Sequence, residues 1–231
     1  MSLSSRFNKV LFLGMCLLLN FSLADAAIQL QQTRLVYPVG KPKVSLVIKN
    51  SDPKNAVTVE SWAESDRRDI TITPVTMVIE PDSKRVLNIH IPARGHDDKQ
   101  ERLYWLNVKG TTRSGSHLPQ QFSIAVINRI KVFYRPLNLF FGVASAYKKI
   151  GVSACRRRLT IKNPTPYYIS FYSFKVDDEE VNGVRTIGPY EIQSAPLPTV
   201  KHNVARWQAI LDTGFHSPPV SKKIKTKCSD Y

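Results

Sequence analysis

The chain has 231 residues, which is enough for one large or two ordinary domains. Its formal net charge of +15 favours an anionic partner, such as nucleic acid, an anionic membrane or an acidic protein. Basic residues are spread along the whole chain, so solvated faces are a simpler explanation of this charge. No segment after the first 26 residues approaches the length of a membrane span.

Residues 1–26 are predicted to form a cleavable signal peptide. Arg6 and Lys9 precede an apolar run, Val10–Leu19, that is too short to span a bilayer stably. Ala24 and Ala26 supply the small residues that signal peptidase requires, so we expect cleavage after Ala26. Removing 26 of the 231 residues leaves 205, in an exported protein without stable membrane insertion. Export argues against nucleic acid as the partner.

Short β-rich runs separated by turn residues occupy the first half of the mature chain. Turn signals such as Gly40 and Asn50–Pro53 recur about every 8–12 residues, which is typical of a β-sandwich. Trp62 and Trp105 lie on such runs and are expected in the core. The expected strands are Leu35–Tyr37, Val44–Lys49, Ala56–Trp62, Ile70–Thr73, Arg85–Ile91, Arg102–Val108 and Gln121–Tyr134.

The last of these runs is the longest, and Pro136 ends it. It opens with Phe122, Ile124 and Val126 at alternate positions, while Ala125 and Ile127 make the opposite face apolar as well. A strand that is apolar on both faces must bury both. In a small antiparallel domain only one face meets the domain's own core. The pattern therefore predicts a partner chain that binds through this strand.

A second series of β-rich runs follows a linker predicted near Leu137–Tyr147. Helical periodicity is scarce throughout, so the chain is predicted to be all-β, with two immunoglobulin-like β-sandwich domains. The predicted boundaries are 27–140 for the N-terminal domain and 141–231 for the C-terminal domain. The expected strands of the second domain are Arg158–Lys162, Tyr167–Val176, Val184–Ile187, Ala205–Leu211 and Ile224–Cys228.

Two cysteines, Cys155 and Cys228, remain after the signal peptide and its Cys16 are removed. An even cysteine count in an oxidising compartment favours a disulfide, and two free thiols are the alternative. The bridge would join the start of the second domain to its C-terminal end.

No motif of catalysis or metal binding occurs in the sequence. The histidines, at positions 90, 96, 117, 202 and 216, are not spaced with Cys, Asp or Glu as metal ligands are. A nucleophile elbow, a phosphate-binding glycine loop and a CxxC pair are also missing. We expect a protein that is not an enzyme and that needs no metal or other cofactor.

Two cations stand out because each flanks an apolar stretch that looks half buried. Arg34 precedes Leu35–Tyr37, and Lys131 lies near the end of the long strand. Lone charges on strands usually point to solvent, which is the alternative here. If the two strands are neighbours, Arg34 and Lys131 form a pocket for a carboxylate, which arginine can bind in a bidentate way.

Four segments, in order, resemble periplasmic pilus chaperones of the chaperone–usher pathway. Thr33-Arg34 is similar to the first strand of that family, Arg102–Val108 to its F strand, and Asn128–Pro136 to the end of its G strand. Asn163–Tyr168 resembles an early motif of its second domain. Together these matches cover the whole mature chain. The short segment between the F and G strands, Lys109 to Gln120, resembles the subclass that serves rod-forming pili.

The resemblance implies two immunoglobulin-like domains in a boomerang arrangement, in a periplasmic protein that folds and caps pilus subunits and delivers them to the outer-membrane usher. Phe122, Ile124 and Val126 would fill the groove that a missing strand leaves in the subunit, by donor-strand complementation. Arg34 and Lys131 would anchor the subunit's C-terminal carboxylate. Weak self-association of the free protein would hide the exposed edge.

The same resemblance implies a charged network between the two domains, formed by Glu101, Arg135 and Asp212. A surface pair worth about 0–1 kcal/mol is the alternative, for Asp212 in particular. An exported two-domain adhesin or structural pilus protein is the competing function. An exported hydrolase with a scattered site is a third hypothesis.

Overall fold

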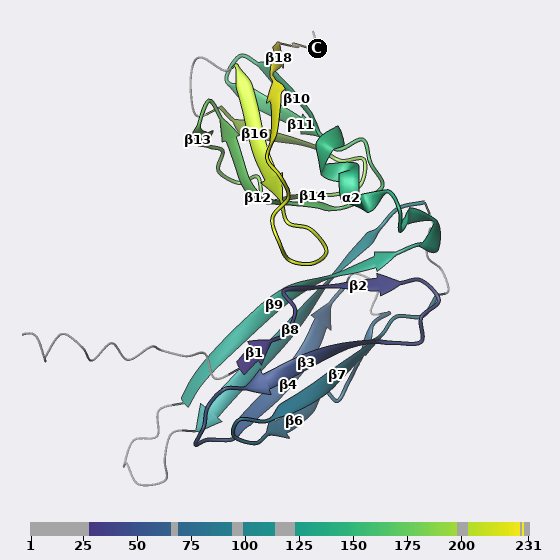
Figure 1. Cartoon of the computed structure of the whole chain (residues 1–231), viewed down its shortest axis with the longest axis vertical. Coiled ribbons are helices and arrows are strands. Elements are labelled where there is room, and N and C mark those ends of the chain that lie inside the picture. The colour runs from purple at the N-terminus through teal and green to yellow at the C-terminus, as the bar shows by residue number, and fades with distance from the viewer. Residues whose placement is uncertain are drawn as a thin grey trace, which may run out of the picture.

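The structure is a computed structural model that describes residues 28–65, 69–93, 99–113, 123–197, 203–226 and 228. The predicted signal peptide, 1–26, lies outside these residues, as do Phe122, His96, His117 and His202. Figure 1 shows two β-domains that meet at an angle. This arrangement confirms the predicted all-β fold with two sandwiches in a boomerang shape.

The first domain is a sandwich of a four-stranded and a five-stranded sheet. The smaller sheet contains, in spatial order, β1 (Ile28–Leu30), β3 (Val44–Asn50), β7 (Lys84–His90) and β5 (Thr71–Thr73). The larger sheet contains β2 (Arg34–Pro38), β9 (Ser123–Arg135), β8 (Arg102–Arg113), β4 (Val57–Glu64) and β6 (Thr76–Ile79).

Alternation along the strands places the core of this domain between its two sheets. On β4, Val57 and Val59 are buried, whereas Thr58 and Glu60 are exposed. The same period of two gives each strand an inner apolar face and an outer polar face. Full burial of one aliphatic side chain contributes about 1.5–3 kcal/mol, so this face fixes the register of each strand.

The long strand β9 has different neighbours along its two halves. It pairs with β8 over its whole length, from Ser123 to Tyr134. On its other side, β2 runs parallel to it and covers only Lys131 to Arg135. Among the described strands none pairs with this second edge of residues 123–130.

The second domain is also a sandwich of two sheets. One sheet contains β15 (Ile192–Pro196), β11 (Arg158–Lys162), β10 (Gly151–Cys155) and β18 (Lys225–Thr226). The other contains β13 (Glu179–Glu180), β12 (Ile169–Val176), β16 (Val204–Ala209) and β17 (Val220–Lys223), with β14 (Thr186–Ile187) paired to β12.

An aromatic cluster forms the centre of the second core. The Trp207 and Phe174 rings stack with centroids 5.6 Å apart, and Phe171 meets Phe174 edge to face at 5.1 Å. The buried indole Nε1 of Trp207 donates a hydrogen bond to the Tyr147 carbonyl oxygen at 3.0 Å. A buried indole N–H needs an acceptor, and here the linker residue Tyr147 supplies it. The bond therefore connects the second core to the linker.

A buried asparagine braces the equivalent turn of each domain. Asn50, at the end of β3, donates from Nδ2 to the Ile79 and Asn55 carbonyl oxygens at 3.0 and 2.9 Å. Asn163, just after β11, donates to the Tyr167 and Gly188 carbonyl oxygens at 2.7 and 2.6 Å. Both side chains are fully buried. Each therefore satisfies backbone groups that the strands leave unpaired.

The linker between the domains is helical rather than extended. It contains two 3₁₀ turns, η1 (Leu137–Leu139) and η2 (Tyr147–Lys149), on either side of a short helix, α2 (Val143–Ala146). Tyr147 and Ala146 are buried against the second core. The segment predicted as a linker is therefore partly built into the second domain.

Three expectations from the sequence are wrong in detail. Trp62 is 39% exposed and Trp105 is only half-buried, because both lie on the outer face of the larger sheet and not in the core. The segment expected as a loop from Lys109 onward begins as strand, since β8 continues to Arg113. The remainder of that segment, 114–120, lies outside the described residues.

A disulfide joins Cys155 to Cys228, with their Cα atoms 5.0 Å apart. It connects the end of β10 to the chain just beyond β18, which pairs with β10 in parallel. The bond therefore holds the C-terminal segment against the edge of its sheet.

Candidate functional site

Arg34 and Lys131 lie directly opposite each other on the parallel strands β2 and β9. Their neighbours explain why both point away from the core of the first domain. Leu35 and Tyr37 are buried in that core, so Arg34 takes the other face of β2. Val132 and Tyr134 are likewise buried in that core, so Lys131 takes the other face of β9. Both cations consequently face the second domain.

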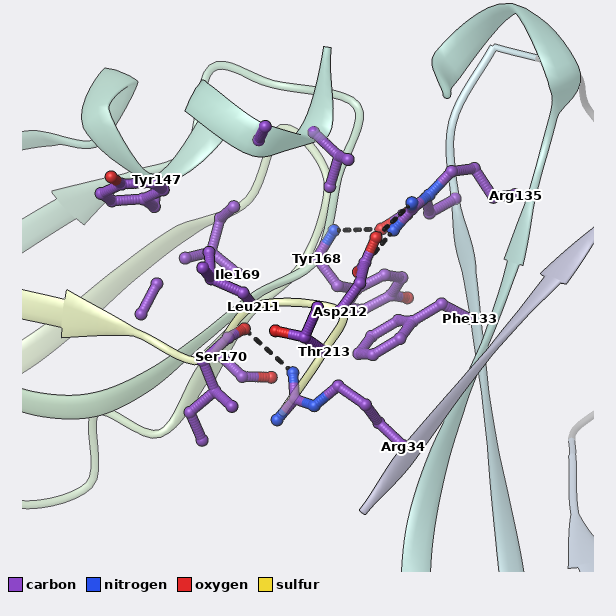
Figure 2. A pocket seen from close by; sticks show the side chains of 15 residues that line it. Arg34, Phe133, Arg135, Tyr147, Tyr168, Ile169, Ser170, Leu211, Asp212 and Thr213 are labelled. Carbon is purple, nitrogen blue, oxygen red and sulfur yellow. Dashed lines mark hydrogen bonds and ion pairs between the residues drawn. The ribbon is translucent and has the colours of Figure 1, made fainter. Parts of the chain in front are cut away.

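Arg34 reaches across the junction and contacts the backbone of the second domain. Its Nη1 donates a hydrogen bond to the Ile210 carbonyl oxygen at 3.0 Å (Figure 2). The side chain is buried, and its Nε has no hydrogen-bond partner in the structure. Burial lowers the pKa of Arg34 from its ordinary value, and the nearby charge of Asp212 opposes that shift. The guanidinium thus keeps unused donor capacity.

Lys131 is held by two hydroxyl groups of the second domain. Its Nζ donates to Ser170 Oγ on β12 at 2.8 Å and to Thr186 Oγ1 on β14. Burial, reinforced by the positive charge of Arg34, lowers the pKa of Lys131 to about 8. Within the described residues, no carboxylate lies within ion-pair distance of either Lys131 or Arg34.

Trp105 is the residue opposite Lys131 on β8. Its indole ring contacts two cations of the outer face of β9, Lys131 and Arg129. Lys131 Nζ is 5.5 Å from the centroid of its indole ring, and the Arg129 guanidinium carbon is 4.2 Å from a ring of the same residue. Such cation–π contacts are attractive and hold both side chains against the indole ring. Arg129 is also paired with Glu64.

Arg135, four residues beyond Lys131, connects the two domains through two carboxylates. Its Nε donates to Glu101 Oε1 at 2.5 Å. Its Nη1 and Nη2 donate to the two Asp212 oxygens at 2.6 and 2.9 Å, a bidentate pair (Figure 2). Burial alone would lower the pKa of Arg135, but these two partners hold it above its ordinary value. The structure thus brings Glu101, Arg135 and Asp212 together.

Glu101 is the most buried member of this triad, with 1% of its side chain exposed. Burial raises its pKa, although Arg135 and the Tyr168 backbone N–H both oppose the shift. That N–H donates to Glu101 Oε2 at 2.8 Å, and the Glu101 N–H donates to the Pro166 carbonyl oxygen at 2.9 Å. Glu101 therefore couples the start of β8 to the second domain through both its side chain and its backbone.

A cavity of 240 Å³ lies in the cleft between the two domains. Arg34, Arg135 and Asp212 line its charged wall, while Phe133 and Leu211 are among its apolar residues (Figure 2). The cavity thus combines apolar side chains with cations and carboxylates from both domains.

The donor residues predicted on β9 are only partly described. Val126 is half-buried and shares the parity of the core residue Ile130. The backbone of Ile124 belongs to β9, and its side chain lies outside the described residues, as does all of Phe122. On the opposite face Ile127 is 56% exposed.

Sequence reasoning missed the groups of the second domain that hold the two cations. These are the hydroxyls of Ser170 and Thr186 and the carbonyl oxygen of Ile210. No sequence signal marks them, because they come from three separate segments that meet only when the domains pack together. Trp105 could have been found, since its position opposite Lys131 follows from the register of β8 and β9.

Residues 27–139 match the N-terminal domain of the pili and flagellar-assembly chaperone PapD, and residues 145–220 match the PapD C-terminal domain. This chain belongs to the pili assembly chaperone family. Pilus chaperones of known sequence resemble it over most of its length. The probable fimbrial chaperone LpfB of Escherichia coli O157:H7 is 26% identical over 225 residues, which cover 94% of this chain and 97% of LpfB. The E. coli chaperone FocC is 30% identical, over 68% of this chain and 72% of FocC.

Solved pilus chaperones share the fold. The E. coli chaperone DraB superposes with a TM-score of 0.73 at 25% identity, covering 85% of this chain and 98% of DraB. The Salmonella enterica chaperone SafB, solved in complex with the SafA pilin, superposes with a TM-score of 0.77 at 19% identity, covering 85% of this chain and 96% of that chain. Family membership favours chaperone function over the adhesin alternative, and the family is one of periplasmic chaperones.

Neither a membrane span nor a metal cluster is found in the described part of the chain. Its helices are all too short to cross a bilayer. Within the same residues, His, Cys, Asp and Glu side chains form no group of three or more that could hold a metal ion.

Proposed function

We propose that this pilus chaperone binds a pilus subunit by lending it the N-terminal half of β9 as an additional strand. The observation that carries the proposal is the unpaired edge of residues 123–130, which ends at the cation pair of Arg34 and Lys131. An unpaired edge offers a row of free N–H and C=O groups to an incoming strand. β-Strand addition uses those groups for affinity and alternate side chains for specificity.

The cation pair supplies the end point of the added strand. A C-terminal carboxylate in the cleft would accept from the free donors of Arg34 and from Lys131 Nζ, in exchange for the hydroxyls of Ser170 and Thr186. Such charge-assisted hydrogen bonds are about twice as strong as neutral ones. Fixing the last residue of the subunit at Lys131 would set the register of every residue before it.

With this register, Val126, Ile124 and Phe122 would enter the groove of the subunit. These residues alternate along one face of the donor strand, five, seven and nine positions before Lys131. The groove lies on the subunit, at the place of the strand that the subunit lacks. Burying each large apolar side chain there would contribute about 1.5–3 kcal/mol.

The remaining steps concern where the chaperone acts and what it meets there. We propose export to the periplasm after cleavage at Ala26, capping of the subunit, and delivery to the outer-membrane usher. No step of this cycle needs a nucleotide or a metal, because strand exchange and subunit folding supply its energy. Free chaperone would protect the β9 edge through weak self-association.

The experiment is co-expression of the tagged chaperone with its pilus subunits and purification from the periplasm. Wild-type chaperone should recover a one-to-one complex, and Arg34→Ala and Lys131→Ala should each lose it. Lys109→Ala is the matched control, because Lys109 lies on the neighbouring strand β8 and pairs with the surface residue Glu60. Subunit recovered equally by Lys131→Ala and Lys109→Ala would refute the anchor.

A further inference from the structure

The turn between β16 and β17 and the neighbouring strand β12 carry exposed aromatic side chains. Phe215 is 76% exposed and Tyr172, on β12, is 57% exposed. The Tyr172 and His216 rings stack with centroids 3.5 Å apart. Tyr172, Phe215 and His216 are called the aromatic patch below. Single exposed apolar side chains are ordinary on protein surfaces. The conformation of the turn and its place beside the cleft are what distinguish the aromatic patch.

Backbone hydrogen bonds close the turn. The Leu211 N–H donates to the Phe215 carbonyl oxygen at 2.8 Å, and the Gly214 N–H donates to the Leu211 carbonyl oxygen at 2.9 Å. Gly214 has φ +86°, and a Cβ there would lie 2.8 Å from Thr33 Oγ1. The tip of the turn therefore packs against Thr33, the residue before Arg34. Phe215 is held exposed by this closed turn, which lowers the entropy cost of binding a partner.

The two segments that hold the cations are the same two that carry the aromatic patch. Ser170, which accepts from Lys131, precedes Tyr172 by two residues on β12. Ile210, which accepts from Arg34, forms a β-bridge with His216. Figure 1 shows the turn between β16 and β17 reaching from the second domain toward β2 and β9. The patch is thus carried by two segments, at Ser170 and Ile210, that also line the cleft proposed to hold the subunit's last residue.

We infer that the aromatic patch is a second contact surface for the bound pilus subunit. This inference rests on the proposed function, since the cation pair must first place the C-terminal end of the subunit in the cleft. The body of a subunit anchored there extends along β9 and starts beside the turn. The patch offers it apolar and aromatic area, so the matching surface of the subunit is apolar and lies next to its C-terminal strand.

The test is a competition between chaperones for one subunit. A complex of untagged wild-type chaperone and subunit is mixed with an equal amount of tagged variant, and the subunit bound to each is measured at equilibrium. Phe215→Ser should capture roughly tenfold less subunit than tagged wild type, as expected for truncation of a central interface aromatic. Tyr172→Ser should show a loss in the same direction.

Phe141→Ser is the matched control, because Phe141 is 97% exposed but lies in the linker. It should compete as well as wild type. Equal capture by Phe215→Ser and Phe141→Ser would overturn the inference, as would a change confined to self-association of the free protein. Lys131→Ala in the same assay separates the two proposals. If Lys131→Ala captures no subunit while Phe215→Ser captures it normally, the anchor stands and the patch is excluded.

Discussion

Arg34 and Lys131 are neighbours in register on parallel strands, and each cation is held by a different segment of the second domain. Arg34 donates to the Ile210 carbonyl oxygen, and Lys131 donates to the hydroxyls of Ser170 and Thr186. A buried and a half-buried like charge therefore lie side by side with neutral acceptors. This is a costly arrangement in the free protein, because neutral dipoles only partly replace water around a charge. A carboxylate placed between them would remove the repulsion.

Subunit binding is predicted to weaken as pH rises through about 8. The pKa of Lys131 lies at about 8 in the free protein. Above that pH the free chaperone is neutral at Lys131, so carboxylate binding must take up a proton. The observed affinity should then fall, by at most about tenfold per pH unit. Dissociation constants measured directly for wild-type chaperone and subunit at pH 7 and pH 9 test this change, and equal affinity at both would contradict it.

The same group should make the free protein more stable at high pH. Its folded pKa of about 8 lies below its ordinary value of 10.5, so the unfolded chain binds more protons between those two pH values. Stability must then rise with pH across that window. Lys131→Met is predicted to be more stable than wild type at pH 7, with a difference that shrinks by pH 10. Urea unfolding at both pH values tests this, and Lys109→Met, on exposed β8 surface, is the control.

Removing Glu101 is predicted to destabilise the junction of the two domains severely. Glu101→Ala leaves Arg135 buried with only Asp212 as its charged partner, and breaking a buried pair costs about 3–5 kcal/mol. Asp212→Ala should cost less, because 36% of the Asp212 side chain is exposed. Urea unfolding followed by tryptophan fluorescence measures both.

Asp178→Ala is the comparison for these variants, because its pair with Arg206 is exposed on both sides. It should change the free energy of unfolding by less than about 1 kcal/mol. If Glu101→Ala were no more damaging than Asp178→Ala, the buried network would have no structural importance.

Much of the fold was predictable because alternation and turn residues report it directly. Buried strands such as β3 and β11 were expected within a residue or two of their observed bounds, since each pairs an apolar face with clear turn signals. β10 and β15 were missed. Their sequences, Gly151–Cys155 and Ile192–Pro196, combine small, polar and proline residues, so only their pairing with β11 makes them strands.

The site was predictable for groups on the strands and not for groups that the domain packing supplies. Arg34 and Lys131 could be singled out because each flanks an apolar stretch. Ser170 and Thr186 look like ordinary strand residues until the second domain brings their hydroxyls to Lys131. Trp105 was expected in the core because tryptophan is usually buried, but the parity of β8 turns it to the outer face.

The disulfide is predicted to stabilise the second domain. Cys155 and Cys228 are 73 residues apart, and the chain-entropy account gives roughly 4 kcal/mol for a loop of that length. The variant with Cys155→Ser and Cys228→Ser should therefore unfold at a lower urea concentration. Reductant should lower the stability of wild type to the same level and leave the double variant unchanged. Equal midpoints for wild type and variant would show that the loop is already constrained without the bond.

Asn163 is predicted to be indispensable for the second domain. Its Nδ2 supplies both buried hydrogen bonds to the Tyr167 and Gly188 carbonyl oxygens, and its Oδ1 accepts from the Thr165 N–H and hydroxyl. Asn163→Leu fills the space but leaves those two carbonyls unpaired, which costs about 1–3 kcal/mol for each buried group.

Asn163→Asp should be at least as damaging, because a carboxylate cannot donate to either carbonyl oxygen when ionised. Urea unfolding gives the loss for each variant, and Asn203→Ala, at an exposed position, should stay within about 0.5 kcal/mol of wild type. Asn50→Leu should cause a comparable loss in the first domain, because Asn50 is equally buried and braces the equivalent turn. A tolerated Asn163→Leu would mean that the turn closes through backbone hydrogen bonds alone, such as the one from the Tyr190 N–H to the Thr165 carbonyl oxygen.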